Sequence, residues 1–169
     1  EVARRTARFQ RHGLAAGDIV FLLFGNRLEF FAELLAIWRL GACAVPVDAR
    51  LTAFEVNTLI STASPRLAVV DDATEPSVTA ALAAAGVATV DTSETGVQQA
   101  TVGLSRLDDD ALILFTSGST GAPKGVIHTH RSLRARWMSL RDQLGVADFS
   151  RTLCLLPTHF GHGLICNSL

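Results

Sequence analysis

Short apolar runs alternate along this 169-residue chain with segments of helical periodicity, and this alternation restricts the possible folds more than any other feature. The apolar runs cover residues 19–24, 42–47, 67–70, 87–90, 111–115 and 152–156. Apolar residues recur at helical spacing in residues 1–12, 27–40, 52–62, 76–86 and 130–144. Continuously apolar strands are typical of parallel sheets that helices cover on both faces. The sequence therefore predicts an α/β fold with layered, parallel-rich sheets flanked by helices.

Several element boundaries carry recognisable signals. Thr52 and Glu55 have the spacing of a capping box that opens a helix. Gly41 and Gly86 follow helical segments at the position where glycine commonly ends a helix. Pro46 lies inside an apolar run, so that strand is expected either at a sheet edge or with an early end.

Composition excludes several classes of protein. A net charge of −1 with 18% charged residues gives no basis for binding nucleic acid or an acidic membrane surface. The longest apolar run, Ile19–Phe24, is too short to span a bilayer, and the amphipathic start of the chain does not resemble a signal peptide. Cys43, Cys154 and Cys166 are odd in number and widely spaced, which favours free thiols in a reducing compartment. We therefore expect a cytoplasmic protein.

A loop rich in glycine, serine and threonine, LFTSGSTGAPKG at residues 114–125, follows the fifth apolar run. Such loops cradle phosphates through backbone N–H groups and hydroxyls, although on composition alone a solvated turn is the alternative. Lys124 is the only lysine, against 14 arginines, and a lysine suits a phosphate oxygen in a tight site. Two residues separate Gly118 from Gly121, so the spacing differs from that of the Walker A motif. The loop therefore predicts phosphate binding outside the P-loop NTPase fold.

At this point the chain resembles a known family. TSGSTGAPKG, residues 116–125, resembles the signature phosphate loop of the adenylate-forming (AMP-binding) superfamily, which includes acyl-CoA synthetases, peptide-synthetase adenylation domains and luciferases. Residues 17–56 are similar to the N-terminal region of that family, and LPTHFGHGL at 156–164 looks like a later motif of the acyl pocket. The resemblance implies that the chain is part of the large N-terminal domain of an adenylate-forming enzyme.

The resemblance also implies a reaction and its binding residues. In that family, the loop grips the β- and γ-phosphates of ATP while a substrate carboxylate attacks the α-phosphate, giving an acyl-adenylate and pyrophosphate. Lys124 would be catalytic, and the Thr116 hydroxyl would help to hold Mg²⁺. The phosphate-contacting set would be Thr116, Ser117, Gly118, Ser119, Thr120, Gly121 and Lys124. Coenzyme A is the expected second substrate, with carrier-protein pantetheine or oxygen as the alternatives.

The histidines have several possible roles. The resemblance implies that His159 or Phe160 lines the substrate pocket, while His162 is expected to be structural. His128 and His130 could join these histidines in a metal cluster, but no cysteine pair or nearby carboxylate completes one, so no metal site is predicted among them. His130 is expected to cap or abut the helix that follows. The arginines of 131–141 are expected to form a solvated helix face.

The chain is expected to be one part of the enzyme: residues 1–107 a first α/β portion and residues 108–169 the phosphate-loop portion of a partial AMP-binding domain. By resemblance, the adenine- and ribose-binding motifs, the Mg²⁺-binding glutamate and a C-terminal domain with its own lysine would lie beyond residue 169. The 169 residues alone are therefore not expected to form an acyl-adenylate. Three alternatives stay open: an adenylation domain that loads a carrier protein, a non-catalytic nucleotide-binding or interaction module, and a kinase-like phosphotransferase. The identity of the carboxylic acid also stays open.

Overall fold

A computed structural model describes residues 1–94, 103, 105–116, 123–145, 153 and 155–166. Its described strands form one sheet in the order β4-β3-β1-β2-β5-β6. The helices and strands are α1 (Val2–Arg11), β1 (Ile19–Leu22), α2 (Leu28–Arg39), β2 (Cys43–Pro46), α3 (Ala53–Ala63), β3 (Leu67–Val70), α4 (Pro76–Ala84), β4 (Ala88–Asp91), β5 (Asp110–Thr116), β6 (Lys124–Thr129), α5 (His130–Leu144) and a π-helical turn, η2 (His162–Cys166).

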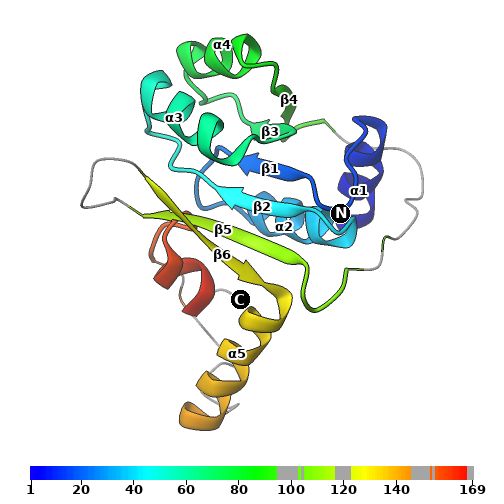
Figure 1. The fold of residues 1–169 in the computed structure, drawn as a ribbon, viewed down its shortest axis with the longest axis vertical. Helices are drawn as coiled ribbons and strands as arrows, with labels where there is room; N and C mark the ends of the chain where they lie inside the picture. Colours follow the sequence, from blue (N-terminus) through cyan, green and yellow to red (C-terminus); the bar gives the residue numbers. More distant parts are fainter. Residues whose placement is uncertain (95–102, 104, 117–122, 146–152, 154, 167–169) are drawn as a thin grey trace.

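Helices cover both faces of this sheet, as Figure 1 shows. One core lies between the sheet and α1, α2 and η2, and includes Phe9, Phe30 and Leu164, each with no exposed surface. The other core lies between the sheet and α3 and α4, and includes Val56 and Leu82. Strands β1 to β5 pair in parallel, whereas β6 returns antiparallel to β5. The predicted layered α/β fold with a parallel-rich sheet is confirmed.

The helix boundary signals hold in the structure. The Thr52 hydroxyl accepts from the Glu55 backbone N–H, and the Glu55 carboxylate accepts from the Thr52 backbone N–H, which completes the capping box. Gly41 and Gly86 both adopt φ of +74°, a backbone conformation that favours glycine. The five predicted helical segments are helices, each within about two residues of its predicted limits.

Of two strand predictions, one holds in one of its alternatives and the other is wrong. Strand β2 is not at an edge, because it lies between β1 and β5; Pro46 instead ends the strand, as the other alternative predicted. The strand predicted over 152–156 is wrong for the described residues 153, 155 and 156, which lie in no strand. Leu153 and Leu155 are 73% and 76% exposed, and strands persist only where a neighbour satisfies their backbone groups. Residues 152 and 154 lie outside the described residues.

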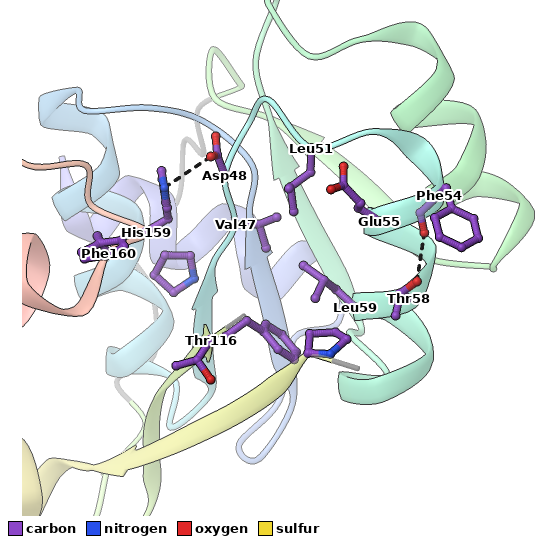
Figure 2. A pocket seen from close by; sticks show the side chains of 13 residues that line it. Val47, Asp48, Leu51, Phe54, Glu55, Thr58, Leu59, Thr116, His159 and Phe160 are labelled. Carbon is purple, nitrogen blue, oxygen red and sulfur yellow. Dashed lines mark hydrogen bonds and ion pairs between the residues drawn. The ribbon is translucent and has the colours of Figure 1, made fainter. Parts of the chain in front are cut away.

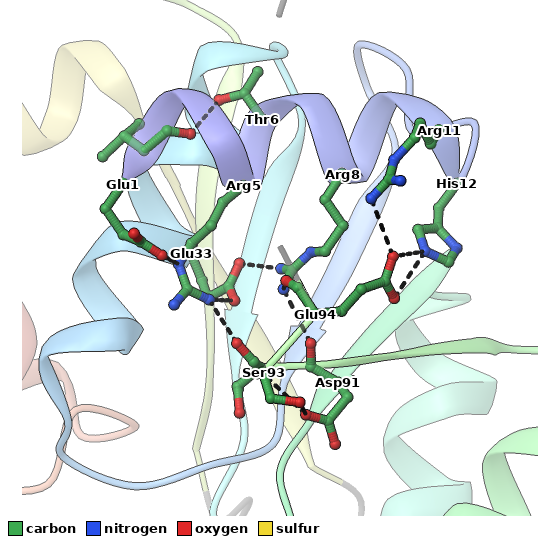
Figure 3. Close-up of polar contacts among 12 residues, drawn as sticks. Glu1, Arg5, Thr6, Arg8, Arg11, His12, Glu33, Asp91, Ser93 and Glu94 are labelled. Atoms are coloured by element: carbon green, nitrogen blue, oxygen red, sulfur yellow. Dashed lines mark hydrogen bonds and ion pairs between the residues drawn. The ribbon is translucent and has the colours of Figure 1, made fainter. Parts of the chain in front are cut away.

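A buried ion-pair cluster joins α1 to α2, which the sequence did not indicate (Figure 3). Arg5 and Arg8 from α1 both donate to the Glu33 carboxylate in α2, and all three side chains are at most 4% exposed. Arg8 also donates to the backbone carbonyls of Asp91 and Glu94, at 3.0 and 2.9 Å. The cluster therefore fastens both helices to the segment that begins where β4 ends.

The described thiols are free. Cys43 is buried in β2 and Cys166 is partly buried, whereas Cys154 lies outside the described residues. Burial raises the pKa of the Cys43 thiol to about 12, with the Asp110 carboxylate as a lesser cause. Among the helices of the described residues, none combines the length and the apolar character needed to cross a membrane.

Candidate functional site

A cavity of about 520 Å³ lies beyond the carboxyl ends of β2 and β5 (Figure 2). Ligands of open parallel sheets commonly bind at this edge, because loops that leave neighbouring strands meet there. The cavity is lined by Pro46, Val47, Asp48, Leu51, Phe54, Glu55, Thr58, Leu59, Phe115, Thr116, Pro123, His159 and Phe160. Three candidate residues from the sequence, Thr116, His159 and Phe160, are therefore brought together here.

The β5–β6 hairpin places both ends of the phosphate loop. Thr116 and Lys124 are register partners, and the Thr116 hydroxyl donates to the Lys124 carbonyl at 3.4 Å. Both residues are exposed, and Thr116 and Pro123 line the cavity. The other candidate loop residues, Ser117, Gly118, Ser119, Thr120 and Gly121, lie outside the described residues. The loop thus leaves and re-enters the sheet at the cavity wall.

Asp48 is a cavity residue that the sequence did not reveal. Its carboxylate accepts from Arg50 Nε and Nη2 at 3.0 and 2.8 Å. The same carboxylate lies 3.4 Å from His159 Nε2. The Arg50 hydrogen bonds are the main reason that the Asp48 pKa is lowered to about 2, and the charge of His159 lowers it further. Asp48 is therefore an anion in the cavity wall whose orientation Arg50 fixes.

Asn26 is the second residue that sequence reasoning missed. It follows β1, two residues after the apolar run 19–24 ends. Its side-chain amide donates to the Leu156 carbonyl at 3.0 Å and accepts from the Thr158 N–H at 2.8 Å. The only sequence signal was an asparagine beside Gly25, and asparagine in turns usually bonds its own neighbours. A partner 132 residues away cannot be found from that signal.

A second cavity, of about 510 Å³, lies beside the same turn. Neighbouring residues of β5 line different cavities, Phe115 the first and Leu114 the second, because side chains alternate along a strand. The second cavity is lined by Leu114, His128, Ser132, Leu133, Arg136, Gly161, His162, Ile165 and Cys166. Arg136 is exposed, as expected for α5, but it also lines this cavity and lies 3.5 Å from Cys166 Sγ. Residues 159–162 therefore form a partition between two cavities.

The histidines of β6 and α5 have separate environments. Burial lowers the pKa of His128. Burial also lowers the pKa of His130, whose ring packs edge-on against Trp38 with 5.2 Å between centroids. His130 is the first residue of α5 and abuts Trp38, while the Thr129 hydroxyl caps the helix by accepting from the Ser132 N–H. Among the described residues, no three histidine, cysteine or acidic side chains are grouped closely enough to hold a metal ion.

These features define an α/β protein in which a loop rich in glycine and hydroxyl side chains follows β5 at the carboxyl edge of a parallel-rich sheet. This arrangement is suited to nucleotides. The family model described as "AMP-binding enzyme" matches residues 1–169. The chain therefore belongs to the AMP-binding enzyme family.

Its relatives include ligases and multidomain synthetases. The long-chain-fatty-acid–CoA ligase FadD13 of Mycobacterium tuberculosis is 33% identical over 156 residues, 86% of this chain and 31% of the ligase. The hybrid PKS-NRPS synthetase pvhA of Talaromyces variabilis is 31% identical over 170 residues, 99% of this chain and 4% of the synthetase. The chain therefore spans a third or less of the length of these two relatives.

A solved structure has the same fold. The o-succinylbenzoate CoA synthetase from Bacillus subtilis, in complex with its acyl-adenylate intermediate OSB-AMP, superposes with a TM-score of 0.88 at 25% identity. The match covers 98% of this chain and 43% of that one. The fold of the described residues is therefore that of one part of an adenylate-forming enzyme.

Proposed function

We propose that this chain supplies the ATP-phosphate-binding part of an enzyme that activates a carboxylic acid and then passes it to coenzyme A. A carboxylate oxygen attacks the α-phosphorus of ATP, the bond from that phosphorus to the bridging oxygen breaks, and pyrophosphate leaves. The observation that carries the proposal is the placement of both ends of the phosphate loop at the cavity that His159 and Phe160 also line. Family membership and the acyl-adenylate complex of the similar synthetase support it.

The loop has the chemistry to hold a leaving pyrophosphate. Lys124 is exposed and follows Pro123, which lines the cavity, and charge placed where charge develops lowers the barrier. The hydroxyls of Thr116, Ser117, Ser119 and Thr120 add hydrogen-bond donors, and the glycines at 118 and 121 allow the backbone N–H groups to approach. We assign Lys124 the catalytic role and this loop the triphosphate.

A magnesium ion fits the same place. The Thr116 hydroxyl is exposed at the cavity, and Mg²⁺ in nucleotide sites takes few protein oxygens because phosphates and waters complete its shell. Bound there, the ion would neutralise part of the charge of the triphosphate. Thr116 would hold it from the end of β5.

The acid is proposed to lie against the turn that carries His159 and Phe160. Phe160 is 60% exposed, which leaves its ring available to a ligand. The second cavity offers apolar walls at Leu114 and Ile165 together with the cation of Arg136. Acids with an apolar body and a second anionic group suit this combination.

Two acceptors for the acyl group are compatible with the relatives. The similar ligase FadD13 and the similar synthetase from Bacillus subtilis are both named for coenzyme A, which favours it as the acceptor. The likeness to a hybrid PKS-NRPS synthetase keeps a carrier-protein pantetheine as the alternative. Free Cys43 and Cys166 support our placement of the reaction in the cytoplasm.

Pyrophosphate exchange tests the proposal. The full-length protein that contains this chain should transfer label from pyrophosphate into ATP when a panel of mono- and dicarboxylic acids is supplied, and not when acid is omitted. The 169 residues purified alone should give no exchange. A phosphorylated acid without exchange would show a kinase-like phosphotransferase instead, and no product with any acid would leave only a nucleotide-binding module.

A further inference from the structure

We propose that Asn26 and Asp48 are positioning residues that hold the turn of His159 and Phe160 against the substrate acid. Both residues belong to the first third of the chain, whereas the turn lies near residue 160. The inference rests on the proposed function only where it names the acid as the ligand. The hold on the turn can be tested without any reaction.

Asn26 acts on the backbone of the turn. Its amide donates to the Leu156 carbonyl at 3.0 Å and accepts from the Thr158 N–H at 2.8 Å, so one side chain fixes both sides of Pro157. Proline has no N–H of its own, and a carboxamide offers a donor and an acceptor at once. Thr158 is only 2% exposed, so little water reaches its surface. The Asn26 side chain thus replaces the neighbouring strand that this segment lacks among the described residues.

Asp48 acts on the imidazole. Asp48 Oδ2 lies 3.4 Å from His159 Nε2 (Figure 2). It also accepts from Arg50 Nη2 at 2.8 Å. The chain reaches Asp48 from β2, a strand that lies inside the sheet with β1 and β5 on its two sides. A carboxylate held by a guanidinium fork has little freedom to rotate. One nitrogen of the His159 ring therefore faces a carboxylate that is carried next to a strand inside the sheet.

The far side of the turn is also closed. The Phe160 N–H donates to the Pro157 carbonyl at 3.0 Å, and the Leu164 N–H donates to the Phe160 carbonyl at 2.9 Å. Leu164 has no exposed surface, and a Cβ added at Gly163 would lie 2.6 Å from the Pro157 oxygen. These contacts hold the turn on its C-terminal side. On its N-terminal side, the direction of His159 and Phe160 depends on Asn26 and Asp48.

The phosphate loop does not depend on this hold. Its ends are fixed by the β5–β6 register, in which Thr116 pairs with Lys124. Loosening the turn should therefore weaken the acid side of the site and leave the ATP side nearly unchanged. A general loss of stability would affect both sides.

The first test compares variants of Asn26 in the full-length protein by pyrophosphate exchange. Asn26→Ala removes both hydrogen bonds and should raise KM for the acid about tenfold or more, since small displacements of substrate-positioning groups cost this much. KM for ATP should stay within about twofold. Asn26→Asp keeps the acceptor for Thr158 and should give an intermediate value. Asn57→Ala, on the exposed side of α3, is the control and should match the parent. Equal rises in both KM values would overturn the proposal.

The second test asks whether Asp48 acts through His159. Asp48→Asn and His159→Gln should each lower kcat/KM for the acid, and the double variant should be no worse than His159→Gln alone. Arg50→Gln removes the Asp48–Arg50 contact without touching His159 and should have a smaller effect than Asp48→Asn. Additive losses in the double variant would contradict a role through His159.

Hydrogen–deuterium exchange gives a measurement that needs no substrate. In Asn26→Ala, the amide of Thr158 should exchange at least about tenfold faster, because its acceptor is gone. In the Asn57→Ala control it should not change. An unchanged exchange rate in Asn26→Ala would show that Asn26 does not hold the turn. Faster exchange in a protein that activates no acid would show that Asn26 holds the turn but would contradict the proposed function.

Discussion

Lys124 pairs in register with Thr116 at the end of β5, and Asp48 lines the cavity beyond β2, and the two charges have different surroundings. No described carboxylate pairs with Lys124, so its ammonium remains available to a phosphate. Asp48 is paired with Arg50 and His159. Lys124 is therefore a cation open to a ligand, whereas Asp48 is an anion that contacts Arg50 and His159.

Replacing Lys124 should therefore affect chemistry more than folding. In the full-length protein, Lys124→Ala is expected to slow adenylation about 10²- to 10³-fold, the usual loss when one preorganised charge-stabilising group is removed. The side chain is exposed, so the free energy of unfolding, measured with denaturant, should change by less than about 0.5 kcal/mol. Arg134→Ala, an exposed cation on α5, should leave both quantities at the parent value. Equal adenylation rates for Lys124→Ala and the parent would remove Lys124 from the mechanism.

Asp48 should titrate far below an ordinary aspartate. Its pKa is lowered from 3.8 to about 2, chiefly by the hydrogen bonds from Arg50, so the ionised form is favoured in the folded state. This contribution to stability is present above pH 3.8 and is lost as the pH falls toward 2. Carbon-detected NMR of the Asp48 carboxyl should show this midpoint, and Arg50→Gln should move it upward. A midpoint near 3.8 in the parent would show that the Arg50 contact is not formed in solution.

Among the elements, α1 and α2 are joined by a buried ion-pair cluster in addition to the apolar core that they share. Two guanidinium groups share the single Glu33 carboxylate in a region closed to water. Periodicity predicted a helix over residues 1–12 with an amphipathic pattern, and arginines in such a helix are usually exposed to solvent. The carboxylate that makes their burial possible lies 28 and 25 residues away in another helix.

Neutralising that carboxylate should be costly. Glu33→Gln leaves Arg5 with only the partly exposed Glu1 carboxylate and removes the carboxylate that pairs with buried Arg8, so it should lower the free energy of unfolding by about 3–5 kcal/mol. Glu29→Gln, in the exposed first turn of the same helix, should change it by less than about 0.5 kcal/mol. Urea unfolding of the three proteins provides the comparison. Similar losses for the two variants would mean that helix propensity, and not the ion pairs, is responsible.

Local sequence patterns predict the helices better than the strands. The helices have local signals, namely apolar spacing, the Thr52 cap and the glycines at 41 and 86, and these signals predicted them correctly. The run at 152–156 has the same apolar character as β3, but a strand also needs a neighbouring strand, and the described residues of this segment lie in no sheet. Whether an apolar run becomes a strand therefore depends on the availability of a neighbouring strand elsewhere in the chain.

In the whole molecule, strand order brings the site together. Strand β2 lies beside β5 although more than 60 residues separate them in sequence, and this places Asp48 near Thr116 and the turn of His159. Binding of a nucleotide to such a site should stabilise the entire fold by mass action.

A thermal-shift measurement on the full-length protein tests that coupling. With Mg²⁺, a non-hydrolysable ATP analogue at 100 times its dissociation constant should add about 2.7 kcal/mol of stability and raise Tm. In Lys124→Ala, the same analogue concentration should give a smaller rise, while stabilisation by AMP, which lacks the phosphates that the loop is proposed to hold, should not change. Equal losses for the two nucleotides would place Lys124 outside the triphosphate site.

The sequence by itself determined the α/β class and the helices, and it predicted a phosphate loop with a lone lysine, because these features depend on residues close together in the chain. Only the tertiary structure decided that Asn26 holds residues 156–158, that Asp48 meets His159 and that Glu33 pairs with both Arg5 and Arg8. These partners are 25 to 132 residues apart. Their contacts follow from the order of the strands and the packing of helices on the sheet, which local spacing does not encode.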